Sequence, residues 1–385
     1  MKKTVDKCFL IIIMLIIIGG FLKSLIFRKD INNYENRVAY NFVMPTIKNF
    51  VDKSFQDSIE LALSDQIPLA ITMKKNYNNI TTKTKKYLAD MIFQKECQNR
   101  YINIGNDLIQ FGCDNYLVSG PWNVYDIQKI VDARITNINK LIETNDTDVY
   151  IYYIERDRDI DFSTNKKSGF APYLKENIKA KKFGSFQINN FNEFAESYYK
   201  TDHHWNYKGS YKAYLDLVEL LNLDNPIKVK DTSCSKLTFT GSHANVGGAS
   251  NIYNEKFCVY NFDIPTHKTI INKNEVAAYG NYNLEALTEI SYANYYGGDA
   301  AELILDFKEP KKENILVFGE SYDNAILNLL ASHYNKTYSI DLRHYEREFG
   351  KPFDYNQYIK EHDIGKVLII GSMSMFTEKE FNMEV

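Results

Sequence analysis

The chain has 385 residues, of which 44% are hydrophobic and 25% charged, and its formal net charge at pH 7 is −3. This length and hydrophobic content suffice for one large domain, or for two smaller ones, with a proper core. The absence of a basic excess argues against nucleic acid as a partner.

The N-terminus has the sequence pattern of a membrane anchor. Three lysines precede an uncharged apolar stretch over 8–22, which Ser24–Phe27 extends past Lys23. The combined stretch has about 20 residues, enough to cross a bilayer, and Lys23 would reach the interface. No small-x-small cleavage site follows, so we predict an uncleaved single-pass anchor within residues 1–29; a buried soluble helix is the alternative. The lysines predict a cytoplasmic N-terminus in the cell membrane and an extracytoplasmic main domain.

Residues 30–95 predict a helical neck that packs on the main domain. Within this segment, apolar residues from Phe55 to Leu63 recur on one helical face, and Pro68 ends the helix. A flexible linker would contain fewer apolar residues.

Four cysteines follow the predicted anchor as two local pairs, Cys97 with Cys113 and Cys234 with Cys258. In an extracytoplasmic domain both pairs could form disulfides, and buried free thiols are an equal alternative. None of the spacings fits a zinc site.

From residue 96 onward, apolar runs typical of buried strands alternate with amphipathic helices. This alternation predicts an α/β domain over 96–385, with helices on both faces of a mostly parallel sheet. Residues 265–310 are irregular and predict a long loop or small insertion near the functional site. The segments with a clear pattern are strands at 108–111, 116–119, 148–155, 314–318, 336–342 and 366–372, and helices at 124–145, 191–200, 210–222 and from about 354.

A serine lies at one of the predicted strand ends. The apolar run Ile315–Phe318 is followed by Gly319 and then Ser321, and apolar residues at helical spacing begin after Asp323, a plausible N-cap. Ser321 is therefore predicted at the carboxyl edge of the sheet, where helix amides would face whatever its hydroxyl attacks. Serine after glycine is also ordinary turn chemistry.

Residues 201–211 read TDHHWNYKGSY. A general base needs an imidazole, which works best when a carboxylate holds its other nitrogen. Asp202 and His204 are two apart, so in an extended or turn segment both side chains can project to the same side. Together with Ser321 they would form a Ser–His–Asp set. The alternatives are that Asp202 caps a helix, that the histidines ligate a metal, and that Trp205 is packing.

The segment TDHHWNYKGSY resembles the signature of the DHHW family, named for Asp202–Trp205. That family is similar to the alginate O-acetyltransferases, whose SGNH-hydrolase-like domain is circularly permuted, so that a D-x-H pair precedes a G-x-S-Y serine. The resemblance implies a three-layer α/β/α flavodoxin-like domain and catalytic roles for Asp202, His204 and Ser321. Further segments that resemble the family lie at 35–45, 64–69, 149–162, 295–303, 319–345 and 367–372.

Some site residues are placed less firmly by the resemblance. His203 occupies the middle of the pair, and His204 is preferred because it keeps the D-x-H spacing. SGNH enzymes use a glycine amide and an asparagine side chain for the oxyanion, for which Gly241, Asn324 and the amide of Ser321 are the candidates.

Two further features are substrate candidates. Arg343 could meet an anionic substrate, or it could form a structural ion pair with an acid. Tyr295 and Tyr296, followed by two glycines, resemble a substrate loop, although a Tyr-Gly turn is also ordinary.

Together these features predict a membrane-anchored serine O-acyltransferase or acetylesterase of the cell envelope that acts on a cell-surface polysaccharide. Ser321 would attack an acetyl ester, and the acyl group would pass to a sugar hydroxyl or to water. No metal or dissociable cofactor is needed, and a membrane protein that supplies acyl groups is an expected partner. The alternatives are a non-catalytic glycan-binding or envelope-assembly protein that keeps the fold, and a metal hydrolase using Asp202 and His203.

Overall fold

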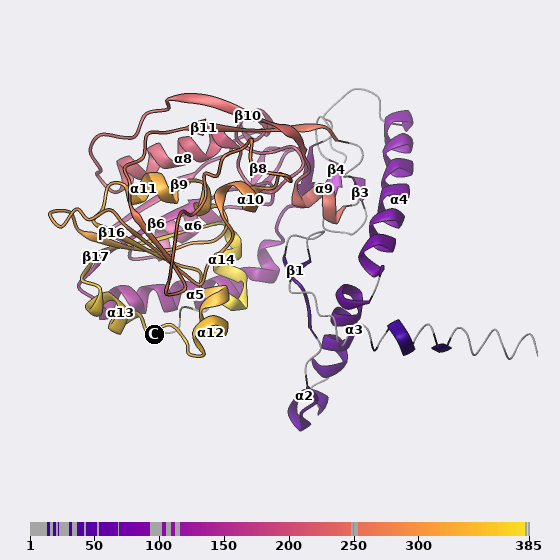
Figure 1. Cartoon of the computed structure of the whole chain (residues 1–385), viewed down its shortest axis with the longest axis horizontal. Helices are drawn as coiled ribbons and strands as arrows, with labels where there is room; N and C mark the ends of the chain where they lie inside the picture. Colours follow the sequence, from indigo (N-terminus) through magenta and orange to yellow (C-terminus); the bar gives the residue numbers. More distant parts are fainter. Residues whose placement is uncertain are drawn as a thin grey trace, which may run out of the picture. The chain divides into compact units, whose positions relative to one another are not determined.

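The computed structural model describes most of the chain beyond the N-terminus (Figure 1). Most of the predicted anchor lies outside the described residues, as do Cys97 and Cys113. Among the helices that are described, none is both long enough and apolar enough to cross a membrane. The described residues are 14–15, 18–20, 22, 31–32, 37–41, 44–51, 54–67, 69–92, 102–104, 109–111, 116–247, 249, 253–381 and 383.

The chain divides into two compact units. The smaller unit comprises residues 1–94, 103–109 and 242–253, and the larger comprises 95–102, 110–241 and 254–385. The segment predicted as a helical neck thus falls in the smaller unit, together with two later segments that its sequence pattern does not indicate. Short strands β3 (Ile102–Ile104) and β4 (Ile109–Phe111) lie where the chain changes unit.

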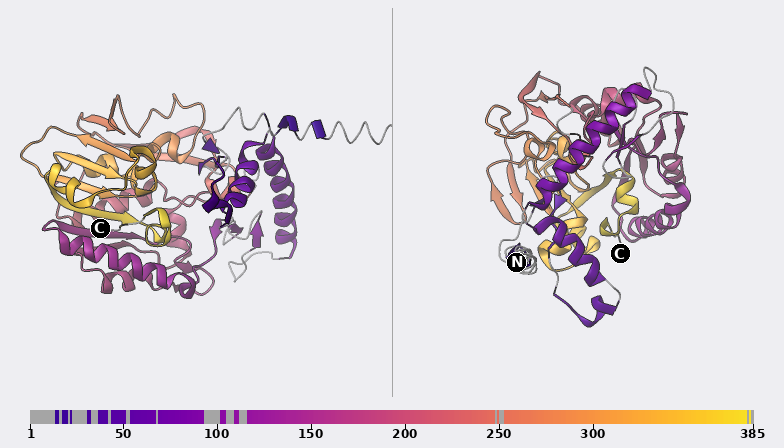
Figure 2. Two further views of the ribbon diagram at one scale, coloured as in Figure 1. Left: turned by 90° about the horizontal axis from the view of Figure 1, so that it is seen from below. Right: turned by 90° about the vertical axis from the view of Figure 1, so that its right-hand side faces the viewer.

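The smaller unit is mostly helical. Its first segment is held to α3 by hydrogen bonds from the amide of Tyr40 to Asp65, 2.8 Å, and from the side chain of Gln66 to the carbonyl of Tyr40, 2.9 Å. The long helix α4 runs without interruption (Figure 2). The elements are β1 (Ile31–Asn32), β2 (Arg37–Val38), α2 (Ile47–Val51), α3 (Ser54–Gln66), α4 (Ala70–Ile92) and α9 (Ser242–Val246).

A mixed eight-stranded sheet forms the centre of the larger unit. Five adjacent strands, from β16 to β9, run parallel, and three antiparallel strands extend one side. In spatial order the strands are β13 (Asn274–Val276), β12 (Lys268–Ile271), β14 (Glu302–Asp306), β16 (Lys336–Ile340), β15 (Asn314–Phe318), β17 (Ile364–Gly371), β6 (Asp148–Ile154) and β9 (Lys182–Phe186).

The order of the parallel strands explains the permutation that the resemblance implied. Numbered from β15, the order β16-β15-β17-β6-β9 reads 2-1-3-4-5, which is the flavodoxin-like order. The chain, however, enters the sheet at β6, the fourth of these strands. Strands that would come first in an unpermuted chain therefore come last here.

Helices cover both faces of this sheet. Alternate residues of the central strands point to opposite faces, as strand geometry requires: Ile151 and Ile369 belong to one buried cluster, and Tyr152 and Ile370 to the other. Figure 1 shows α8 and α11 on one side of the sheet and α5 and α13 on the other. The cluster that contains Ile151 and Ile369 packs on α5 (Val124–Thr144), α6 (Phe170–Asn177), α12 (Leu342–Phe349), α13 (Tyr355–Glu361) and α14 (Met373–Thr377). The cluster that contains Tyr152 and Ile370 packs on α7 (Phe191–Ser197), α8 (Tyr207–Leu220), α10 (Tyr292–Tyr296) and α11 (Leu327–Ala331).

The larger unit also holds two-stranded sheets outside the main sheet. Strand β10 (Asp231–Phe239) pairs antiparallel with β11 (Glu255–Asn261), and a disulfide between Cys234 and Cys258 joins them. Of the two cysteine pairs in the sequence, this one is therefore oxidised. The other small elements are β5 (Leu117–Ser119), β7 (Ile160–Asp161), β8 (Lys166–Lys167), η2 (Asp323–Ala325) and η3 (Lys379–Phe381).

The structure differs from the sequence-based expectation over 265–310. Strands β12 and β14 fall within this segment and extend the main sheet, so the segment is only partly an insertion. The turn between β12 and β13 uses positive φ angles at Asn272 and Lys273. Because lysine is unusual in such a turn, the sequence carries no Asn-Gly signal there, and the hairpin was not predicted.

Candidate active site

Ser321 lies just beyond the end of β15. The order of the parallel strands reverses between β15 and β17, and the crevice at such a reversal is where open α/β sheets bind ligands. The turn needs glycine at position 319, because a Cβ there would come within 1.9 Å of a carboxylate oxygen of Asp323. Asp323 does not cap a helix as the sequence suggested; it lies inside the short helix η2, which begins after Tyr322. Burial raises the pKa of Asp323, and the carboxylates of Asp299 and Asp341 raise it further.

The predicted Ser–His–Asp residues form a continuous hydrogen-bonded chain. The Nε2 atom of His204 lies 2.7 Å from the Oγ of Ser321, and its Nδ1 lies 2.6 Å from Oδ1 of Asp202. The same carboxylate oxygen accepts the backbone N–H of His204 at 3.0 Å. With an ionised Asp202 accepting from Nδ1–H, Nε2 is left as the acceptor for the serine hydroxyl.

Asp202 is held in its ionised form. Burial alone would raise its pKa, but the electrostatic interactions with His204 and His203 and the hydrogen bonds from His204 outweigh burial, so that the pKa lies well below its ordinary value. The alternative of a helix cap does not apply, because Asn206 caps α8 and accepts from the amides of Lys208 and Gly209.

A second group of residues fixes the backbone beside Asp202. The carboxylate of Glu255 accepts the amides of Lys200 and Thr201, at 2.7 and 3.0 Å, and also the hydroxyl of Thr201. That hydroxyl in turn accepts the amide of Gly241 at 3.0 Å. A Cβ on Gly241 would come within 2.4 Å of the Cβ of Asp202. The predicted oxyanion donor Gly241 is thus engaged elsewhere, and its role in this geometry is to allow close packing behind Asp202.

Tyr292 stacks on the imidazole of His204. The ring centroids are 3.9 Å apart and the planes are inclined by only 6°. The hydroxyl of Tyr292 accepts from the indole of the fully buried Trp205 at 3.1 Å and donates to the carbonyl of Tyr322 at 3.3 Å. Sequence reasoning missed Tyr292, and it assigned Trp205 correctly to the packing alternative.

Tyr295 and Tyr296 do not form an exposed substrate loop. Both lie in α10, both are at most 5% exposed, and both pack on Phe257. Burial raises the pKa of Tyr295 to about 12. The helical spacing of these two tyrosines with Tyr292 was the available signal that all three belong to one buried helix rather than to a loop.

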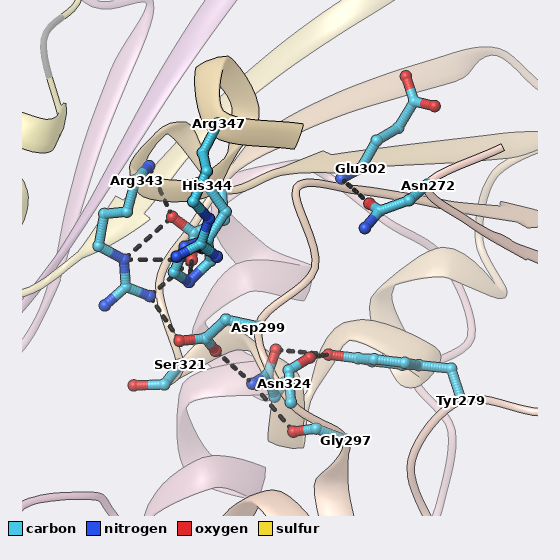
Figure 3. A network of polar contacts seen from close by, with 12 residues as sticks. Asn272, Tyr279, Gly297, Asp299, Glu302, Ser321, Asn324, Arg343, His344 and Arg347 are labelled. Carbon is cyan, nitrogen blue, oxygen red and sulfur yellow. Dashed lines mark hydrogen bonds and ion pairs between the residues drawn. The ribbon is translucent and has the colours of Figure 1, made fainter. Parts of the chain in front are cut away.

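Asn324 and Arg343 belong to a network behind the serine turn (Figure 3). The side-chain amide of Asn324 donates to the carbonyl of Gly297 at 3.3 Å and to Asp299 at 3.0 Å, and its oxygen accepts from Tyr279 at 2.9 Å. Both N–H groups of the amide are therefore used, which argues against the predicted oxyanion role.

Arg343 is paired with acids rather than presented as an isolated cation. Its guanidinium lies 2.7 Å from Asp299 and 2.6 Å from Asp341 (Figure 3). Because two carboxylates flank one guanidinium, this position does not offer the net positive charge that an anionic substrate would require. The ion-pair alternative stated from the sequence describes Arg343 better.

The alternative of a metal site concerns Asp202, His203 and His204. The ligand atoms of Asp202, His203 and His204 all lie within 4.8 Å of one another, so this donor set suits a metal in chemical type. Both ring nitrogens of His204, however, are engaged by Asp202 and Ser321. A metal held by all three residues would have to replace one of these hydrogen bonds.

Comparison with known proteins supports the fold. No family model matches the sequence, and no curated protein matches it. Bacillus cereus PatB1 with a sulfonyl adduct is similar in structure, with 22% identity, 74% of this chain and 99% of that chain covered, and a TM-score of 0.57. A DHHW family protein from Eubacterium siraeum follows, with 13% identity, coverage of 74% and 96%, and a TM-score of 0.53. At these identities the likeness establishes the fold, and at that level it confirms the resemblance to the DHHW family.

A third similar structure is the O-acetyltransferase domain of Pseudomonas putida AlgJ. It shares 11% identity, covers 70% of this chain and 92% of that chain, and has a TM-score of 0.38. That score is too low to establish a shared fold.

Proposed function

We propose that this chain is a serine O-acyltransferase or acetylesterase that acts on a cell-surface polysaccharide. The observation that carries the proposal is the hydrogen-bonded chain from Ser321 through His204 to Asp202, with contacts of 2.7 and 2.6 Å. Such contacts are short enough for direct proton transfer, and residues in these roles activate a serine on several unrelated folds.

In the proposed reaction, the Oγ of Ser321 attacks the carbonyl carbon of an acetyl ester while Nε2 of His204 takes the hydroxyl proton. The bond to the leaving oxygen then breaks, and His204 gives its proton to that oxygen. A sugar hydroxyl or water attacks the resulting acyl-serine, again losing its proton to His204, which returns it to Ser321. Asp202 orients the ring and stabilises its transient positive charge.

Backbone amides are the proposed oxyanion donors, because Gly241 and Asn324 are engaged elsewhere. Within the described part of the chain, the N–H groups of Ser321 and Tyr322 donate to no acceptor. Both follow the sheet edge directly before η2. An oxyanion donor typically contributes about 2.7–4 kcal/mol to the transition state.

We propose a single-pass location in the cell membrane, with the N-terminus in the cytoplasm and both units outside. The apolar stretch over 8–27 supports the anchor, and the disulfide between Cys234 and Cys258 fits an oxidising compartment. The resemblance to alginate O-acetyltransferases supports a polysaccharide acceptor. A membrane protein that exports acyl groups is the proposed partner, because the site lies outside the compartment where activated acyl groups are made.

Hydrolysis of p-nitrophenyl acetate by the purified chain tests the proposal. We expect Ser321→Ala to abolish the enzyme-dependent rate, and Ser185→Ala, on the edge strand β9, to leave it unchanged. A sulfonyl fluoride reagent should add its mass to Ser321 in the parent protein and to no residue in Ser321→Ala. Equal rates for parent and Ser321→Ala, with no labelling, would establish the non-catalytic alternative.

A further inference from the structure

Helix α4 in the smaller unit exposes an apolar stripe. Met73, Tyr77, Ile80 and Tyr87 recur at intervals of four, three and seven residues, and each is between 65% and 69% exposed. At this spacing the four side chains lie along one face of the helix. A surface helix ordinarily turns such a face toward the core.

The opposite face of α4 is polar and buried. Asn78, Asn79 and Thr82 are at most 9% exposed. Asn78 donates to the carbonyl of Val246 at 3.4 Å, and Thr82 donates to that of Gly247 at 2.7 Å. The helix is thus attached to its own unit by polar contacts and presents its apolar side outward, the arrangement of a helix that has a second, apolar partner.

The charge of α4 indicates what kind of partner this is. The helix contains Lys74, Lys75, Lys83, Lys85 and Lys86 but a single acidic residue, Asp90. A basic helix with an apolar stripe is typical of helices that lie on anionic lipid. Two copies of the same basic helix would instead repel each other.

A second apolar group precedes α4 in the same unit. In and just before α2, Met44, Ile47, Phe50 and Val51 are each at least 61% exposed. The apolar N-terminal stretch ends near residue 27, so the chain between it and Met44 spans at most about 60 Å when fully extended. If that stretch crosses the bilayer, α2 stays within reach of its surface.

We propose that the apolar stripe of α4, assisted by α2, lies on the surface of an anionic phospholipid bilayer. Met73 and Ile80 would enter the boundary of the acyl chains, the rings of Tyr77 and Tyr87 would take the interfacial level that tyrosine favours, and lysines would contact lipid phosphates. The smaller unit is then a platform on the membrane as well as a connection to it. This proposal is independent of the chemistry at Ser321.

Tryptophan fluorescence in reconstituted full-length protein tests the docking. Tyr77→Trp places a probe in the stripe, and Tyr125→Trp is the matched control, because Tyr125 is 94% exposed on α5 of the larger unit. Each spectrum is measured as a difference from the parent, which has two tryptophans of its own. In vesicles of phosphatidylglycerol and phosphatidylcholine, we expect a blue-shifted Tyr77→Trp emission that brominated acyl chains quench, and an unshifted, unquenched control. Tyr87→Trp gives a second probe in the stripe.

Two further measurements identify the occupant. Replacing phosphatidylglycerol by phosphatidylcholine, or introducing Lys74→Glu with Lys83→Glu on the two flanks of the stripe, should reduce the quenching at position 77. Equal, water-like emission from Tyr77→Trp and Tyr125→Trp overturns the proposal. A blue shift in detergent that grows with protein concentration also overturns the proposal, because it would indicate a second copy of the chain. A blue shift that requires added polysaccharide overturns it as well.

Discussion

The stacking of Tyr292 on His204 leads to a prediction that separates positioning from packing. Two variants of Tyr292 separate the contribution of its hydroxyl from that of its ring. Tyr292→Phe keeps the ring 3.9 Å from the imidazole and removes only the hydroxyl, whereas Tyr292→Leu removes both ring and hydroxyl. The hydroxyl accepts from the buried indole of Trp205.

The hydroxyl and the ring should affect different measurements. Without its acceptor, the buried indole N–H is left unsatisfied, so both variants should lose about 1–3 kcal/mol of unfolding free energy. The ring face stabilises the imidazolium that forms when Ser321 attacks, an interaction worth about 0.5–2 kcal/mol. Tyr292→Leu should therefore also lose roughly 2- to 30-fold in kcat, with KM little changed, while Tyr292→Phe keeps its kcat.

The assay is p-nitrophenyl acetate hydrolysis at varied substrate concentration, beside chemical denaturation of the same preparations. If Tyr292→Leu loses stability but retains the kcat of the parent, Tyr292 is packing only and the positioning argument is refuted.

Three other predictions concern the surroundings of the site. Asp202→Asn should lower kcat by roughly 10³–10⁴-fold, because the ring loses the partner that orients it. Because folding lowers the pKa of Asp202, the ionised carboxylate stabilises the parent above a pH of about 3.9, and this stability is lost as the pH falls through the lowered pKa. A pH series of unfolding free energies should show this dependence only in the parent. Gly241→Ala should cost about 1–3 kcal/mol by overpacking against Asp202 and reduce turnover with it, whereas unchanged stability would disprove the close approach. Replacing Cys234 and Cys258 together by alanine should cost about 2–4 kcal/mol in non-reducing denaturation, and dithiothreitol should affect only the parent.

The part of the site that sequence predicts well is local or repeats a known motif. Asp202 and His204 are two residues apart, and Ser321 follows an apolar run and a glycine, so residue types and spacing mark them as candidates, and the family resemblance pairs them; the structure brings their side chains together. The same holds for β6, β15 and β17, whose apolar runs leave little choice but a buried strand.

The part that sequence predicts badly depends on partners far along the chain. Asn324 is a plausible oxyanion donor by residue type, but Tyr279, Gly297 and Asp299 take all of its hydrogen-bonding groups. Gly241 does not serve as an oxyanion donor either, because its amide donates to the hydroxyl of Thr201. Such choices are decided by tertiary contacts across tens of residues, and no local pattern records them.

The permuted order of the chain has little consequence for the chemistry, and the sheet explains why. The order of the strands in space determines which loops meet, and it is the same flavodoxin-like order that an unpermuted chain would give. The loop after β9 and α7 brings Asp202 and His204, and the turn after β15 brings Ser321, 117 residues later than His204. What the permutation does change is which segment precedes the sheet. Here the chain passes first through the smaller unit and then into β6, so a basic, apolar helix comes before every residue of the candidate triad. If the N-terminal stretch is an anchor and α4 lies on lipid, as proposed, the permutation lets a single N-terminal segment provide both the anchor and the membrane contact, while β15, which leads to Ser321, remains in the core of the larger unit.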